Sequence, residues 1–212
     1  MTQDKTFLKL NLGCGAKKLP GFVNIDSVKE FDPDLLHDVS QPLPYGDGVV
    51  DEIVADGLLE HFDKYVRFLV FYEWARVLKI GGTVNVSVPN MKKLLFRYFK
   101  FGFEKFVDTV FGETMLGSET YIGHFGNHKW AYSKGSLETF MRFFGIEPVK
   151  VETNCLVLRV IGRKTRHITK DQIDQIKIYS SANDCGVGKA HTSVGEARQK
   201  IKIFNGCHEQ PS

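Results

Sequence analysis

Short apolar runs, each closed by glycine, proline or an acidic residue, recur along the first half of the chain. Runs of this length, rich in Leu, Val, Ile and Phe, predict β-strands, and little polar interruption is typical of strands in a parallel sheet. The predicted strands are 7–12, 22–25, 34–39, 49–55 and 83–88. The link between the first two contains Pro20 and is too short for the helix that usually joins parallel strands.

Longer segments with helical spacing follow these strands. Asp63 is a good N-cap for a helix over 64–78, and Gly81-Gly82 is expected to end that helix. Its apolar residues nearly encircle it, so we expect it to be buried. Ser133 is expected to cap a second helix that closes at Gly145.

The C-terminal part of the chain divides into a hairpin and a basic extension. Segments 147–152 and 155–161 predict an antiparallel hairpin that closes the core near Gly162. Residues 163–212 hold 9 Lys and Arg against 5 Asp and Glu, whereas the whole chain carries a net charge of only +3. A helix is predicted over 169–179, but apolar residues here are too sparse for an independent core. Packing on the main domain, pairing in a homodimer and partial disorder all stay open.

A glycine turn and a lone acidic residue mark the tips of the first two predicted strands. Gly13 and Gly15 let the backbone approach a ligand closely, and Asp26 closes the second strand, where a carboxylate can accept both hydroxyls of a ribose. The alternative is an ordinary glycine turn beside a solvated acid. A dinucleotide site needs a third glycine where this chain has Lys18, and no P-loop spacing occurs. The pattern therefore favours a ligand that has a ribose but no phosphate chain.

Three ordered motifs carry a family resemblance. The segments LNLGCG…GFVNID, LPYGDGVVDEIVADGLLEHF and ARVLKIGGTVNVSVPN resemble those of class I S-adenosylmethionine-dependent methyltransferases. The subgroup most similar is the small predicted methyltransferases with an LGCG…NvD…LEH…RVLKPGG signature. The resemblance spans about residues 7–162. It implies an α/β fold with a doubly wound, Rossmann-like seven-stranded sheet, mostly parallel with one antiparallel strand near the C-terminal end.

The resemblance also implies which residues hold S-adenosyl-L-methionine. The expected cofactor-binding residues are Asn11, Gly13, Cys14, Gly15, Asp26, Asp38, Val39, Asp56 and Gly57. Asp26 is expected at the ribose. Asp38 is expected near the adenine, although it is equally suited to cap the turn that follows it. Asp56 and Gly57 are expected near the methionine end or the substrate. His61 is either a base near neutral pH or, as in many class I enzymes, a residue that orients its loop.

The segment 117–132 is rich in glycine, His, Trp and Tyr and fits no regular period, so it is predicted to be a loop over the pocket. Its candidate substrate-binding residues are His124, His128, Trp130 and Tyr132. One of the two histidines is also the candidate catalytic base. Their spacing of four residues is also found in metal sites on helices. However, the sequence places no third ligand nearby, and the glycines disfavour a helix here. We therefore expect no metal.

A basic aromatic helix is predicted over 91–111, within an insertion that spans 91–132. Its stripe consists of Phe96, Phe99, Phe103, Phe106 and Val110. Such a helix can lie on a membrane surface or against nucleic acid. We favour a lid helix that packs this stripe onto the domain with solvated lysines, because Glu104 and Asp108 dilute the positive charge.

Composition narrows the class of protein. No stretch approaches the roughly 20 apolar residues of a membrane span, and the N-terminal residues lack an apolar signal core, so we expect a cytoplasmic location. The four cysteines are scattered, which indicates reduced thiols. Neither an [ND]-P-P-[FY] nor a Pro-Cys motif occurs. The expected acceptor is therefore a small molecule or a sugar-like compound, and nucleic acid is not expected as a partner.

Two other functions compete with methyl transfer. One is a non-catalytic module that binds an adenosyl cofactor and docks a partner through the basic helix and tail. The other is a nicotinamide oxidoreductase, which the missing third glycine disfavours. The main expectation is a methyltransferase domain over 1–162, followed by the extension 163–212.

Overall fold

The computed structural model describes residues 7–101, 128–154 and 156–181. The chain divides into two units, residues 1–168 and residues 169–212. The described part of the second unit is the helix α5, Lys170–Ser181, which matches the helix predicted over 169–179. Within the described residues, no helix is both long and apolar enough to cross a membrane.

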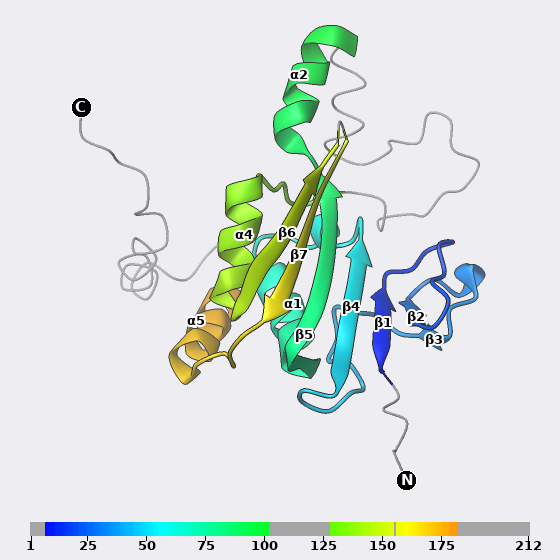
Figure 1. The fold of residues 1–212 in the computed structure, drawn as a ribbon, viewed down its shortest axis with the longest axis vertical. Helices are drawn as coiled ribbons and strands as arrows, with labels where there is room; N and C mark the ends of the chain where they lie inside the picture. Colours follow the sequence, from blue (N-terminus) through cyan, green and yellow to red (C-terminus); the bar gives the residue numbers. More distant parts are fainter. Residues whose placement is uncertain (1–6, 102–127, 155, 182–212) are drawn as a thin grey trace. The chain divides into compact units, whose positions relative to one another are not determined.

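The first unit is built on one seven-stranded sheet, drawn in Figure 1. Its strands are β1 Lys9–Leu12, β2 Val23–Asp26, β3 Leu35–Leu36, β4 Val50–Asp56, β5 Leu78–Pro89, β6 Ile146–Thr153 and β7 Val157–Lys164. Their spatial order is β3-β2-β1-β4-β5-β7-β6. The first five strands run parallel, and β7 is antiparallel to both β5 and β6. The predicted seven-stranded, mostly parallel sheet of a Rossmann-like α/β fold, with its antiparallel strand near the C-terminal end, and the predicted hairpin are therefore confirmed.

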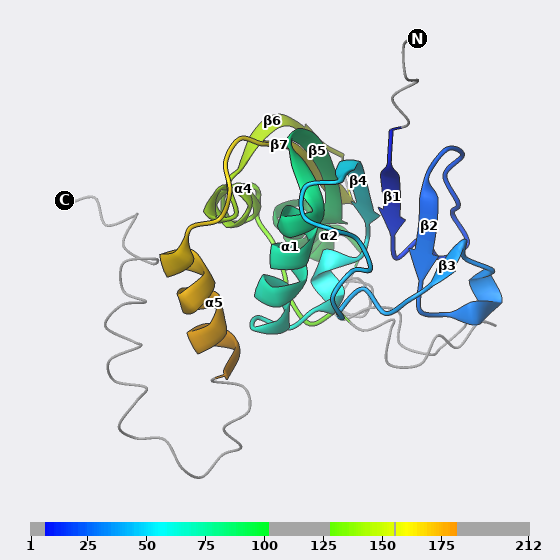
Figure 2. The same cartoon turned by 90° about the horizontal axis from the view of Figure 1, so that it is seen from below.

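Helices cover one face of the sheet. Among the described residues of this unit, the helices are η1 Lys29–Phe31, η2 Leu59–His61, α1 Val66–Val77, α2 Met91–Phe101 and α4 Lys134–Phe143. Figure 2 shows α1 and α4 on the same side of the strands. The ring of Phe71 on α1 lies 5.0 Å from those of Phe140 and Phe144. Burial of these aromatic rings against strand side chains such as Val86 and Val160 builds the core.

The opposite face of the central strands is polar. Lys9, Glu52, Thr83 and Asn85 alternate with the buried positions of their strands, and Lys9 Nζ forms an ion pair with the Glu52 carboxylate at 3.0 Å. Figure 2 shows α1 and α4 on the other side of the sheet. The reason is local, because the β1–β2 link contains no α-helix, as predicted, and the β2–β3 link contains only η1.

The role predicted for Gly81-Gly82 is wrong. Helix α1 ends at Val77, and the next residue already belongs to β5, which runs through both glycines. Gly81 has φ +84°, and a Cβ on Gly82 would lie 3.0 Å from the Asp51 carbonyl oxygen. The pairing of β4 with β5 shifts register at this point. These glycines therefore permit an irregularity in the strand. In the sequence alone, two adjacent glycines look the same whether they end a helix or interrupt a strand.

The predicted ends of α4 agree with the structure, whereas α1 begins at Val66 rather than Lys64. Its N-cap residue is Tyr65, although Asp63 Oδ1 accepts from the N–H groups of Tyr65 and Val66 at 2.8 and 2.9 Å. The Ser133 hydroxyl accepts from the Ser136 N–H and caps α4, and Gly145 has φ +74° just after the helix. On α2, Leu94 is buried, but Phe96 is 69% exposed. The prediction that the phenyl stripe packs onto the domain is therefore wrong at Phe96. Phe103, Phe106 and Val110 lie outside the described residues.

Candidate functional site

The glycine bend and Asp26 meet at the carboxyl ends of β1 and β2. Gly13 and Gly15 both have positive φ, and a Cβ on Gly13 would lie 2.7 Å from a methyl carbon of Leu58. The Gly15 N–H donates to Asp26 Oδ2 at 2.8 Å, and the Val28 N–H donates to Oδ1 at 2.9 Å. The carboxylate therefore faces the bend and is held there. Each of its oxygens keeps a further lone pair that can accept a ligand hydroxyl.

A network of polar side chains supports the loop that replaces a crossover helix. Asn11 Nδ2 donates to Asn24 Oδ1 at 2.9 Å and to the Lys17 carbonyl at 3.0 Å. Asn24 Nδ2 in turn donates to Asp34 Oδ2 at 2.7 Å. The backbone and side-chain hydrogen bonds from Asn24 lower the pKa of Asp34. The side chain of Asn11 thus orders the loop. Asn24 and Asp34 were not among the predicted site residues. Asn24 is marked in the sequence only as a polar residue inside an apolar run, and Asp34 only as an acid at the start of one.

The two residues expected near the adenine follow β3. Asp38 is exposed, and its Oδ1 accepts from the Ser40 N–H at 2.9 Å, which is the turn-capping alternative named above. Val39 is buried beside it. The predicted strand 34–39 is shorter than expected, because only Leu35–Leu36 pair with β2.

Asp56 ends β4 and joins the glycine loop to the centre of the sheet. Its Oδ2 accepts from Lys17 Nζ at 2.8 Å, and Arg159 lies 3.9 Å from Oδ1. Burial acts to raise the pKa of Asp56, but hydrogen bonds from Lys17 and Ser87 outweigh it and lower the pKa. Asp56 is therefore a stable anion. The next residue, Gly57, has φ +68° and donates its N–H to the Ser87 carbonyl.

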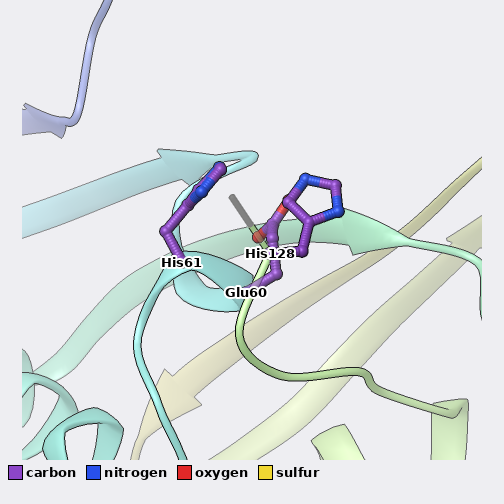
Figure 3. Close-up of side chains that lie close together, drawn as sticks. All are labelled: Glu60, His61 and His128. Atoms are coloured by element: carbon purple, nitrogen blue, oxygen red, sulfur yellow. The ribbon is translucent and has the colours of Figure 1, made fainter. Parts of the chain in front are cut away.

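Glu60, His61 and His128 form a compact cluster beside this strand end, shown in Figure 3. One ligating atom from each lies within 4.8 Å of the other two. Glu60 Oε1 lies 4.0 Å from His128 Nε2, and the two imidazole rings are 4.9 Å apart in an edge-to-face arrangement. The Glu60 side chain is only 3% exposed. Burial raises the pKa of Glu60 to about 8, with a smaller contribution from the charge of Asp56.

Backbone hydrogen bonds hold His128 in this cluster. The Glu60 carbonyl oxygen accepts from the N–H groups of Lys129 and Trp130 at 2.7 and 3.0 Å. The guanidinium of Arg67 on α1 lies 4.2 Å from the Trp130 ring. The described end of the predicted loop is thus fixed against η2 and α1. The sequence argument against a metal, that no third ligand is nearby, does not hold in the folded chain.

The remaining predicted substrate residues have different positions. Tyr132 is 1% exposed, and its ring lies 6.2 Å from Phe140 in the aromatic core. Its burial raises the pKa of the phenol to about 12. The assignment of Tyr132 to substrate binding is therefore corrected to core packing. His124 lies outside the described residues.

Comparison with family models gives no match for the sequence, and comparison with curated protein sequences gives none either. Solved structures do match. The PH0226 protein of Pyrococcus horikoshii OT3 matches with a TM-score of 0.54 and 15% identity, covering 77% of this chain and 84% of that one. A Thermotoga maritima S-adenosylmethionine-dependent methyltransferase, described as a possible histamine N-methyltransferase, matches with a TM-score of 0.53 and 15% identity, covering 74% and 82%.

A third match is the 1,6-didemethyltoxoflavin-N1-methyltransferase of Burkholderia thailandensis, solved with 1,6-didemethyltoxoflavin and S-adenosylhomocysteine. Its TM-score is 0.51 at 14% identity, covering 75% of this chain and 71% of that one. At such identities the likeness shows the fold alone. The chain has the fold of S-adenosylmethionine-dependent methyltransferases.

Proposed function

We propose that this protein is an S-adenosylmethionine-dependent methyltransferase that acts on a small-molecule or sugar-like acceptor. The observation that carries the proposal is the Asp26 carboxylate at the tip of β2, hydrogen-bonded to the Gly15 N–H of a positive-φ bend. A protein with the same fold is known with bound S-adenosylhomocysteine. We assign the activity to the first unit of the chain.

The residues of this edge fit an adenosyl cofactor. A Cβ added at Gly15 would meet no atom within 4 Å, so the space beside the bend is open next to the Asp26 carboxylate. In the proposal, the backbone from Asn11 through Gly13 and Cys14 to Gly15 lines the adenosyl group, and Asp26 accepts the ribose hydroxyls. Asp38 and Val39 follow β3, on the side where the adenine would lie.

The methionine end would lie toward β4. The anionic Asp56 is paired with the exposed Lys17 of the glycine loop, and a ligand ammonium group can compete for the same carboxylate. Gly57 follows directly and leaves this strand end without a side chain. We assign acceptor binding to His128 and Trp130, which lie next to this end through their contacts with η2.

Bound S-adenosylmethionine would supply an activated methyl group: the acceptor nucleophile would bond to the methyl carbon, the carbon–sulfur bond would break, and S-adenosylhomocysteine would leave. The protein contributes alignment of the two reactants and exclusion of water. A hydroxyl acceptor would also lose a proton, and His124 or His128 is the predicted base that would accept it. The alternative of a non-catalytic module depends on docking through the basic helix 91–111 and the tail 163–212, and the described parts of these segments do not favour it.

Calorimetric titration of the full chain with S-adenosylmethionine and with S-adenosylhomocysteine tests the proposal. We expect saturable binding of both, with one ligand per chain. Binding of neither would refute the proposed function. Incubation with methyl-labelled cofactor and a panel of hydroxylated small molecules would then identify the acceptor by transfer of the label.

A further inference from the structure

We propose that Glu60, His61 and His128 bind one divalent transition-metal ion. The two imidazoles and the carboxylate bring their ligating atoms within 4.8 Å of one another (Figure 3). Two His and one carboxylate form a ligand set used by Zn²⁺ and by other first-row divalent ions. Bonds of about 2.0–2.2 Å to one ion place its ligand atoms roughly 3–4 Å apart, so small side-chain rotations would complete the site.

A second observation points to a ligand at this position. Glu60 Oε2 is buried and has no hydrogen-bond partner within the described part of the chain. Burial of a carboxylate without a partner is costly, and a coordinated cation removes that cost. The 4.0 Å between Glu60 Oε1 and His128 Nε2 exceeds hydrogen-bond length and lies in the range of two ligands on one ion.

The cluster is also held in place by its surroundings. Glu60 and His61 belong to η2, and the Glu60 carbonyl fixes the segment of His128 through the N–H groups of Lys129 and Trp130. Ligands that are held before binding lose less conformational entropy when the ion arrives. Residues that lie far apart in the sequence are thus brought together by backbone contacts that do not depend on the metal.

The position of the cluster relates the ion to the proposed reaction. A Cβ added at Gly57 would lie 3.7 Å from Glu60 Oε1, so the cluster adjoins the strand end assigned to the methionine group and the acceptor. Three protein ligands leave coordination positions for water or for an oxygen or nitrogen of the acceptor. This link to the acceptor rests on the proposed function, whereas metal binding itself is independent of it.

Titration of the chelator-treated full chain with Co²⁺ and Zn²⁺ tests the site. We expect binding of one ion that produces visible Co²⁺ absorption and raises the melting temperature. His61→Ala, His128→Ala and the isosteric Glu60→Gln should each weaken binding by about 10-fold or more, as loss of a ligand or of its support does. His167→Ala, which removes an exposed histidine outside the cluster, should leave binding unchanged.

Two outcomes would overturn the inference. One is that the wild-type chain binds neither ion. The other is that binding is the same in all three cluster variants, which would place the ion at other His or Cys side chains. Melting curves without metal check that the variants fold. Titration with S-adenosylhomocysteine separates the two proposals, because metal binding without cofactor binding would support the site while refuting the proposed function.

Discussion

Replacing Asn24 with alanine tests whether side-chain hydrogen bonds stand in for the missing helix between β1 and β2. The Asn24 amide oxygen accepts from Asn11 Nδ2 at 2.9 Å and from the Leu19 N–H at 2.7 Å. Its Nδ2 donates to Asp34 Oδ2 at 2.7 Å. One side chain therefore joins β1, the loop after it and the segment before β3.

The magnitude follows from the groups that lose a partner. In Asn24→Ala, the Leu19 N–H and one proton of Asn11 lose their acceptor in part-buried surroundings. Asp34 also loses a donor, but it is exposed and water can replace the bond. Because each buried group left unsatisfied costs about 1–3 kcal/mol, we expect the free energy of unfolding to fall by about 2–4 kcal/mol. With a urea dependence of about 2 kcal/mol per molar, the midpoint should fall by roughly 1–2 M.

Urea unfolding of the full chain, followed by circular dichroism, measures this change. Gln41→Ala is the matched control, because it removes an exposed amide that donates to Ser40 Oγ at 3.4 Å. Its effect should stay within about 0.5 kcal/mol. If the midpoint of Asn24→Ala equals that of the control, the network does not support the loop and the reasoning is refuted.

Three further predictions concern the cofactor, the strand irregularity and a turn. Asp26→Asn should weaken S-adenosylhomocysteine binding by about 10-fold or more in calorimetry, since hydrogen bonds to a charged group contribute about 1.5–3 kcal/mol. The control Asp32→Asn, on an exposed turn, should leave the affinity unchanged. Equal affinities of the two variants would show that Asp26 does not bind the cofactor. Gly82→Ala should lower stability by about 1–3 kcal/mol in thermal melts because its Cβ would crowd a carbonyl oxygen. Gly135→Ala, with open space at its Cβ, is the control, and a match between the two would contradict the crowding argument. Arg76→Lys should lower the free energy of unfolding by about 1–2 kcal/mol, because a lysine cannot reproduce hydrogen bonds to two carbonyls and two carboxylates. An unchanged melting temperature would contradict this explanation.

Local patterns in the sequence were sufficient for most elements of the fold, but not for the start of β5 or the length of β3. The apolar runs placed the strands, and Ser133 and Gly145 placed the ends of α4, because strand burial and helix capping depend on residues close in the chain. The short, Pro-containing link after β1 correctly predicted the absence of a crossover helix. The glycine bend and the acid after it drew attention to the edge where Gly15 and Asp26 meet.

Contacts between distant segments were decided only by the tertiary structure. Gly81-Gly82 has the composition of a helix stop, but crowding by β4 makes it a strand irregularity. Lys164 is another case, since its Nζ is buried and donates to the carbonyls of Ala75 and Leu78 at the end of α1. No local pattern predicts this, because the acceptors belong to another element.

The cluster of Glu60, His61 and His128 shows the same division most clearly. The chain order separates the first two from the third, and the Glu60 carbonyl, which accepts from the N–H groups of the two residues after His128, helps to bring them together. Residue types along the chain thus determined which chemistry was available, whereas packing determined which side chains could act on one ligand. The physical reason is that capping and periodicity act over a few residues, while burial and hydrogen bonding act between any segments that the sheet places side by side.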